Sequence, residues 1–198
     1  DGAGVVLSAR LLNLGIDTRV AGCDMVSEIC KVAAGMGRSV YLLGAAPGVA
    51  DKAAENLVRQ TPGLQIAGVR DGYFDPEDEL RIIADIRVAK PAALFVALGA
   101  PRQEEWIVRH MDELGVAVCI GIGGSFDVIS GLKPRAPIWM QRCGMEWLYR
   151  AIREPSRIPR LSALPLILWL TFNELLKAPA APPPEQDPES QPSRENTR

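Results

Sequence analysis

Four short, almost entirely apolar segments alternate with helix-like segments through the middle of this chain. They cover about residues 39–43, 64–69, 93–98 and 116–122. Near-continuous apolar strands separated by helices are typical of a parallel sheet that is covered on both faces. The sequence therefore predicts an α/β fold with a Rossmann-like, mostly parallel sheet. Helices are expected over about 3–14, 25–36, 49–60 and 76–89, with a further helix ending at Leu114 and Asp24 as the N-cap of the second.

Glycine-rich or polar loops follow all four predicted strands, at 44–48, 71–75, 99–104 and 121–127. In open parallel sheets, ligands bind beyond the carboxyl ends of the strands. The 44–48 loop, Gly-Ala-Ala-Pro-Gly, precedes a helix, and its small residues would let backbone N–H groups approach a phosphate. It has neither the GxGxxG pattern nor the Lys-Ser/Thr of a P-loop, so an ordinary strand–helix turn is the alternative.

The 99–104 loop occupies the same topological position after the third strand. Gln103 and Glu104 could hydrogen-bond a sugar or a nucleotide there. Alternatively, Pro101 is simply the first helical residue and Glu104 complements the helix dipole. The carboxylates Asp24 and Asp127 also flank loops, where an N-cap and a turn residue are the simpler interpretations.

Basic residues are concentrated between 133 and 160. This stretch holds seven Lys or Arg against two Glu, and it runs into the apolar segment 161–176. A basic segment followed by an apolar, aromatic one is typical of a helix that lies at a membrane surface. A buried core helix is the alternative for 161–176. No apolar run reaches the roughly 20 residues that span a bilayer.

These patterns divide the chain into three parts. Residues 1–134 are predicted to form an α/β domain, with a ligand site at its strand ends, whose N-terminal part is missing. Residues 135–177 are predicted to form a basic and apolar, membrane-associating C-terminal helical appendage, with one helical stretch over 138–153. Residues 178–198 contain six prolines and are predicted to be a disordered tail.

The amino-acid composition argues against two classes of function. The formal charge of −2 argues against a general nucleic-acid binder. The four cysteines form no CxxC pair and His110 is the single histidine, which argues against a Cys/His zinc site. We expect the cysteines to be small buried hydrophobes in a reducing cytosol.

Several short motifs occur together in a fixed order. They are Asp1-Gly-x-Gly4, Arg19-Val-Ala-Gly-x-Asp24, Leu43-Gly44, Gly72-Tyr-Phe74, Gly99-Ala-Pro-Arg-Gln-Glu-x-Trp106, Gly121-x-Gly-Gly-x-Phe-Asp-x-x-Ser-Gly131, Arg135-Ala-Pro137 and Glu146-Trp-Leu-Tyr-Arg150. In this combination the sequence closely resembles the WecG/TagA/CpsF family of glycosyltransferases over about residues 1–176. Family members carry a further N-terminal segment before the first motif, which contributes to the pocket. We therefore expect that part of the protein to be absent here and activity to depend on it.

The resemblance implies an inverting transfer of N-acetylmannosamine or a related sugar from a UDP-sugar. The acceptor would be an undecaprenyl-diphosphate-linked sugar, in teichoic acid or other surface-polysaccharide synthesis. It implies no cofactor, a metal-independent reaction, and a cytoplasmic protein peripheral to the inner face of the membrane. Asp1 would be the catalytic base and Gln103 a pocket residue with a catalytic role.

Further residues are predicted to bind substrate. The resemblance places Arg150, Arg157 and Arg160 over the pocket, where they would meet a diphosphate. Tyr73 is predicted to stack on uracil and Asp127 to bind ribose. The remaining predicted substrate-binding residues are Gly44, Ala45, Gly99, Glu104, Gly123, Gly124 and Arg135.

Two other functions are compatible with parts of the sequence. A Rossmann-like sheet would suit an NAD-type oxidoreductase, although no GxGxxG follows the first predicted strand and no acidic residue follows at the expected distance. A non-catalytic, membrane-associated scaffold is the second alternative. NADH binding would favour the former, and failure to bind any UDP-sugar would favour the latter.

Overall fold

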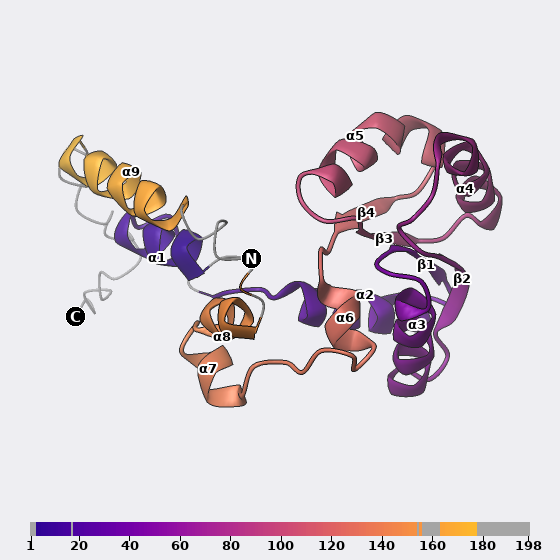
Figure 1. The fold of residues 1–198 in the computed structure, drawn as a ribbon, viewed down its shortest axis with the longest axis horizontal. Coiled ribbons are helices and arrows are strands. Elements are labelled where there is room, and N and C mark those ends of the chain that lie inside the picture. Colours follow the sequence, from indigo (N-terminus) through magenta and orange to yellow (C-terminus); the bar gives the residue numbers. More distant parts are fainter. Residues whose placement is uncertain (1–2, 17, 154, 156–162, 178–198) are drawn as a thin grey trace, which may run out of the picture.

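The computed structural model describes residues 3–16, 18–153, 155 and 163–177. Four strands alternate with helices in the first two thirds of the chain, and further helices follow (Figure 1). The elements are α1 (Ala3–Leu11), α2 (Gly22–Gly35), β1 (Ser39–Gly44), α3 (Val49–Gln60), β2 (Gln65–Arg70), α4 (Pro76–Ala89), β3 (Ala93–Ala97), α5 (Arg102–Leu114), β4 (Val118–Gly121), α6 (Ser125–Ile129), α7 (Ile138–Arg142), α8 (Glu146–Arg153) and α9 (Ala163–Lys177).

The four strands form one parallel sheet in the order β2-β1-β3-β4. The predicted α/β fold with a Rossmann-like parallel sheet is therefore confirmed. The central strands β1 and β3 are buried almost throughout, whereas the edge strands β2 and β4 are mostly half-exposed. Along the chain the strand order reverses at β1, because β2 is added on one side and β3 on the other. The carboxyl ends of β1 and β3 consequently lie at a topological switch point, the usual ligand position in such sheets.

Alternate side chains of the central strands build a core on each face of the sheet. Val40 and Leu42 of β1 face one core, which α2, α3 and α6 cover. Tyr41 and Leu43 face the other core, which α4 and α5 cover. Figure 1 shows the two helical layers on opposite sides of the strands. This arrangement leaves the loops at the carboxyl ends of the strands free to form a site.

Two local predictions near the helices are wrong. Asp24 is not the N-cap of α2, since the helix begins earlier, at Gly22, with Ala21 as N-cap and no side-chain cap. Asp24 instead lies in the first turn, where it pairs with Arg135. The predicted helical stretch 138–153 is divided into α7 and α8, because the chain turns at Gly144, which has a φ of +71°. That left-handed conformation suits glycine and ends α7.

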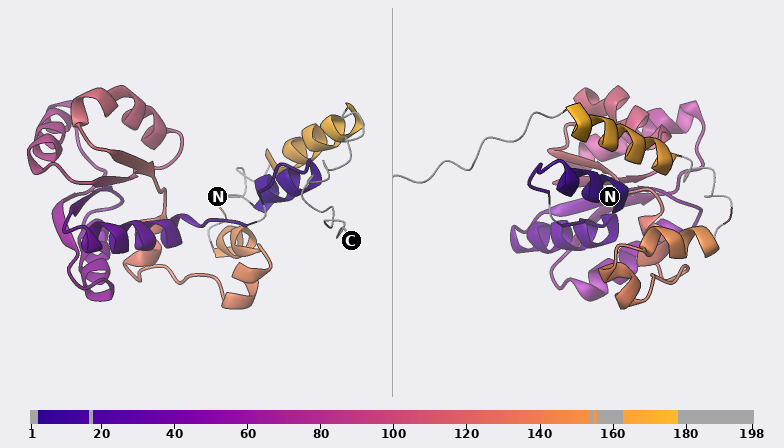
Figure 2. Two further views of the ribbon diagram at one scale, coloured as in Figure 1. Left: turned by 180° about the vertical axis from the view of Figure 1, so that it is seen from behind. Right: turned by 90° about the vertical axis from the view of Figure 1, so that its left-hand side faces the viewer.

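The first and last described helices, α1 and α9, pack against each other although they lie at opposite ends of the sequence. Figure 1 and the left view of Figure 2 place this pair beyond α7 and α8 and away from the sheet. The hydroxyl oxygens of Ser8 and Thr171 are 2.7 Å apart at the contact. Among the described residues, no helix has the length and apolar character required to cross a bilayer.

The cysteines follow the expectation only in part. Cys23 and Cys30 are buried, and burial raises the pKa of the Cys30 thiol to about 12. Cys119 is partly buried, and Cys143 is exposed in the turn after α7, so the prediction was wrong for Cys143.

Candidate functional site

The loops after all four strands surround one cavity, which we call the strand-mouth pocket, with a volume of about 790 Å³. This size is suitable for a small ligand such as a nucleotide-sugar. The loops are joined by backbone hydrogen bonds, from Ala45 N–H to Ala97 O and from Gly72 N–H to Ala45 O. The lining residues are Gly22, Ala45, Ala46, Gly72, Tyr73, Ala97, Leu98, Gly99, Ala100, Arg102, Gln103, Glu104, Gly121, Ile122, Gly123, Gly124, Ser125, Asp127 and Lys133.

Most of the predicted site residues outside the arginines come together in this pocket. Ala45, Tyr73, Gly99, Gln103, Glu104, Gly123, Gly124 and Asp127 all line it. Gly44 lies directly behind the lining, at the end of β1, opposite Ala97 of β3. Its φ is +117°, and a Cβ there would lie 2.5 Å from the carbonyl carbon of Ala97. Gly44 therefore lets the two central strands remain close at the pocket floor.

Gln103 is buried in the pocket wall and is held by its neighbours. Its Oε1 accepts a hydrogen bond of 2.9 Å from Gly123 N–H, and its Nε2 donates one of 2.7 Å to Glu104. It lies over Gly121, where a Cβ would be only 2.7 Å from its Nε2. Gln103 thus fixes the loop after β4 and orients the Glu104 carboxylate.

Charged side chains from separate elements also line the pocket. Asp127, in the first turn of α6, forms a 2.8 Å ion pair with Lys133. Lys133 was not among the predicted site residues, although it begins the basic stretch found in the sequence. Arg102 also lines the pocket, with its guanidinium carbon 5.6 Å from the centre of the Phe74 ring. The pocket therefore contains two cationic side chains and a highly exposed aromatic ring, Tyr73.

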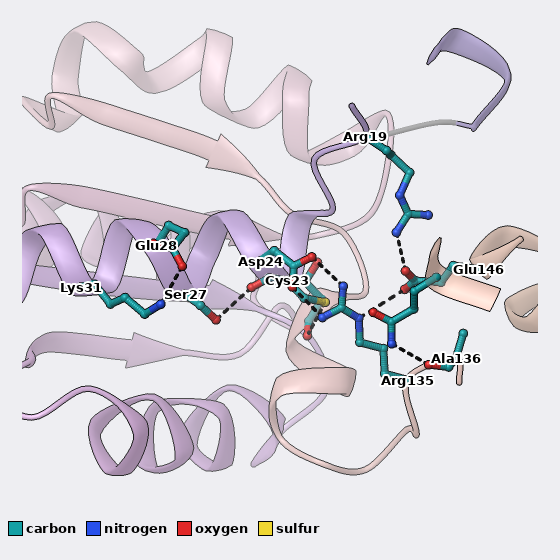
Figure 3. A network of polar contacts seen from close by, with 11 residues as sticks. Arg19, Cys23, Asp24, Ser27, Glu28, Lys31, Arg135, Ala136 and Glu146 are labelled. Atoms are coloured by element: carbon teal, nitrogen blue, oxygen red, sulfur yellow. Dashed lines mark hydrogen bonds and ion pairs between the residues drawn. The ribbon is translucent and has the colours of Figure 1, made fainter. Parts of the chain in front are cut away.

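Arg135 belongs to a different set of contacts, beside the strand-mouth pocket (Figure 3). Its guanidinium donates two hydrogen bonds to Asp24, at 2.5 and 2.6 Å. These bonds hold the pKa of Asp24 below its ordinary value, and the same pairing raises the pKa of Arg135. Glu146 is only 2% exposed. Its Oε2 accepts a hydrogen bond of 2.5 Å from Arg19 Nη2, and its Oε1 lies 3.9 Å from Arg135 Nε. This charge network ties α2 to the start of α8.

The remaining predicted residues are only partly described. Arg150 lies on α8, but its side-chain position is not described. Asp1, Arg157 and Arg160 lie outside the described residues, as does the predicted tail 178–198. Their predicted roles remain predictions.

Comparison with known proteins identifies the family. A profile of the glycosyl transferase WecG/TagA/CpsF family matches residues 1–181. The chain belongs to this family. It is accordingly a glycosyltransferase, and the family assignment predicted from the ordered motifs is confirmed.

Two members of the WecG/TagA/CpsF family illustrate the similarity. The chain is 39% identical over 188 residues to the N-acetylglucosaminyldiphosphoundecaprenol N-acetyl-beta-D-mannosaminyltransferase of Bacillus subtilis (strain 168), covering 94% of this chain and 73% of that protein. It is 36% identical over 169 residues to the protein of the same name from Staphylococcus aureus (strain MW2), covering 85% and 66%. The chain therefore spans most, but not all, of the length of these relatives.

Proposed function

We propose that this protein transfers N-acetylmannosamine, or a closely related sugar, from a UDP-sugar to an undecaprenyl-diphosphate-linked acceptor in teichoic acid or another surface-polysaccharide pathway. The observation that carries this proposal is the strand-mouth pocket at the switch point of a parallel sheet, in a member of this glycosyltransferase family. The names of the two relatives support both the sugar and the acceptor.

The donor fits the pocket with its nucleotide toward the exposed Tyr73 and its diphosphate toward the cations. Tyr73 offers a ring face on which uracil stacks, and Asp127 accepts hydrogen bonds from ribose hydroxyls. Lys133 and Arg102 offset the charge of the diphosphate. Arg150, Arg157 and Arg160 add to this positive charge when the appendage covers the pocket.

The chemistry is a single displacement. The acceptor hydroxyl oxygen forms a bond to C1 of the donor sugar from the face opposite UDP, while the bond from C1 to the diphosphate oxygen breaks and the configuration inverts. Asp1 takes the hydroxyl proton, and a general base of this kind contributes about 10² to 10⁴-fold to the rate. Gln103 and Glu104 position the sugar at the strand mouth. The reaction requires no metal, because cationic side chains and N–H groups stabilise the leaving diphosphate.

A lipid-linked acceptor requires the enzyme to meet the inner membrane surface. The paired helices α1 and α9 carry exposed apolar side chains, including Leu7, Leu168, Trp169 and Phe172. Apolar and aromatic side chains on a surface helix, near a basic stretch, suit shallow insertion between lipid headgroups. We infer a peripheral protein on the cytoplasmic face.

A ligand screen by thermal shift tests the donor. A ligand that binds only the folded state stabilises it by RT ln(1 + L/Kd), where L is the free ligand concentration, and so raises the melting temperature. UDP-N-acetylmannosamine should raise it more than UDP-glucose, and NADH should not raise it. Stabilisation by NADH but not by UDP would support an oxidoreductase instead. In the full-length protein, Asp1→Asn should keep UDP binding and lose transfer to the lipid-linked acceptor.

A further inference from the structure

A second cavity, of about 710 Å³, lies between α1, the start of α2 and the α7–α8 turn. We call it the arginine cavity. Four arginines line it: Arg10, Arg19, Arg135 and Arg142. None of its lining residues belongs to the strand-mouth pocket. The donor proposed above leaves this cavity without a role.

The guanidinium groups of the arginine cavity favour an anionic ligand. Asp24 and the buried Glu146 pair with two of the cavity's four arginines, Arg135 and Arg19. The carboxylates hold Arg19 and Arg135 in fixed positions. A fixed guanidinium loses little side-chain entropy when it binds a phosphate, and it can donate two parallel hydrogen bonds. A diphosphate esterified at both ends carries one negative charge on each phosphate, so it can accept hydrogen bonds from more than one guanidinium group.

Apolar side chains also line part of the arginine cavity. Leu7 of α1 and Ile138 of α7 lie in the lining, and both are substantially exposed. Trp147 adds an aromatic side chain. The α1 helix that provides Leu7 also packs against the apolar helix α9. An anion with an attached hydrocarbon chain therefore suits the cavity better than a free nucleotide or an inorganic ion.

The two cavities share a wall. Gly22 lines the strand-mouth pocket, whereas Arg19 and Asp24 on either side of it line the arginine cavity. Likewise, Lys133 lines the first cavity and Arg135 the second. The Asp24–Arg135 ion pair joins these two segments, as Figure 3 shows. Ligands in the two cavities would therefore lie on either side of one thin partition.

We propose that the arginine cavity binds the prenyl diphosphate of the acceptor, with its hydrocarbon leaving toward α1 and α9. This assignment rests on the proposed function and deepens it, because it separates the acceptor diphosphate from the donor diphosphate. The acceptor sugar then reaches across the shared wall to the donor in the strand-mouth pocket. Arg142 and Ile138 contact the acceptor and leave donor binding unaffected.

The test measures binding to the chain by calorimetry. The probes are UDP and a soluble acceptor analogue, N-acetylglucosamine linked through a diphosphate to farnesol. Arg142→Gln should weaken binding of the analogue about tenfold, because a charge-assisted contact to phosphate is lost, while UDP affinity stays the same. Ile138→Ser should weaken binding of the farnesyl analogue but not of inorganic diphosphate. Arg87→Gln, on the exposed surface of α4, is the control that changes neither.

The outcomes separate this inference from the proposed function. Unchanged analogue binding in Arg142→Gln, with UDP still bound, would overturn the cavity assignment and leave the donor proposal standing. If the wild-type protein does not bind UDP and Arg142→Gln still loses binding of the analogue, the cavity assignment would be supported and the donor proposal overturned. If Arg142→Gln loses UDP binding and analogue binding to the same extent, the arginine cavity would be assigned to the donor. If short-chain phosphatidylglycerol binds as tightly as the acceptor analogue, the cavity would be a general site for lipid phosphates and the acceptor assignment would be overturned.

Discussion

Gly44 illustrates how a single residue determines the floor of the strand-mouth pocket. A Cβ at this position would lie 2.5 Å from the carbonyl carbon and oxygen of Ala97, and the φ of +117° is unfavourable for any L side chain. Gly44→Ala should therefore destabilise the protein by about 3 kcal/mol or more, because β1 and β3 must separate or the backbone must change. Urea unfolding measures the loss. Gly35→Ala, at the end of α2 with open space around its Cα, is the control and should change stability little.

Asp24 should make stability depend on pH in the acidic range. Its pKa is lower in the folded protein than in the unfolded chain, chiefly because Arg135 hydrogen-bonds the ionised carboxylate. Such a group stabilises the fold above its unfolded pKa, and this contribution is lost as pH falls through the folded pKa. Asp24→Asn should therefore cost at most about 1 kcal/mol near pH 6, because the pair is partly exposed to solvent.

The difference between wild type and Asp24→Asn should shrink as the pH falls below about 4. Chemical unfolding at a series of pH values measures it. Asp112→Asn, on the exposed surface of α5, serves as the matched control. A difference that stays constant down to pH 3 would show that the Asp24–Arg135 pair does not respond to protonation.

At the scale of elements, Glu146 connects α8 to the segment before α2. Its carboxylate is almost completely buried against Arg19 and Arg135. Removing one partner of a buried ion pair leaves the other charges poorly compensated, so Glu146→Gln should lower the free energy of unfolding by about 3 kcal/mol. A double-mutant cycle with Arg19→Gln isolates the pairwise energy. Glu105→Gln on exposed α5 is the control, and a coupling energy within experimental error would refute the connection.

The sequence predicted the elements of the sheet domain well, for local reasons. Helices 49–60 and 76–89 have the predicted bounds, and Asp75 caps the second by accepting hydrogen bonds from the backbone N–H groups of Glu77 and Asp78. Alternating strands and helices also predicted that the strand-end loops would meet, and they form the strand-mouth pocket. Gly144 could have indicated that 138–153 forms two helices, because a glycine in the left-handed conformation ends a helix, but the helical pattern of the stretch suggested a single one.

Contacts between distant segments could not be predicted from local pattern. Asp24 resembled an N-cap in sequence because a helix begins nearby, yet its partner Arg135 lies 111 residues away. The pairing of Ser8 with Thr171 spans 163 residues. Neither hydrophobic periodicity nor loop chemistry specifies which distant surface such a side chain meets, so the arginine cavity became visible only in the folded structure.

For the whole molecule, the decisive feature is that the two ends of the described chain form one apolar unit beside the cavities. Thr171 of α9 faces Ser8 of α1, and the opposite surface of α9 exposes Trp169 and Phe172. If this unit lies in the lipid headgroups, the arginine cavity opens near the membrane and the strand-mouth pocket lies farther toward the cytoplasm. That order matches a lipid-linked acceptor and a soluble donor.

Substitution of the exposed aromatic side chains tests this orientation. Trp169→Ser combined with Phe172→Ser should reduce sedimentation with phosphatidylglycerol vesicles about tenfold or more, because two large apolar side chains no longer enter the bilayer. The melting temperature should change little, since both side chains are 60% exposed. Val88→Ser, an equally apolar exposed site on α4, should leave sedimentation unchanged. Equal sedimentation of all three proteins would place the membrane contact elsewhere, and the acceptor would then have to reach the arginine cavity by another route.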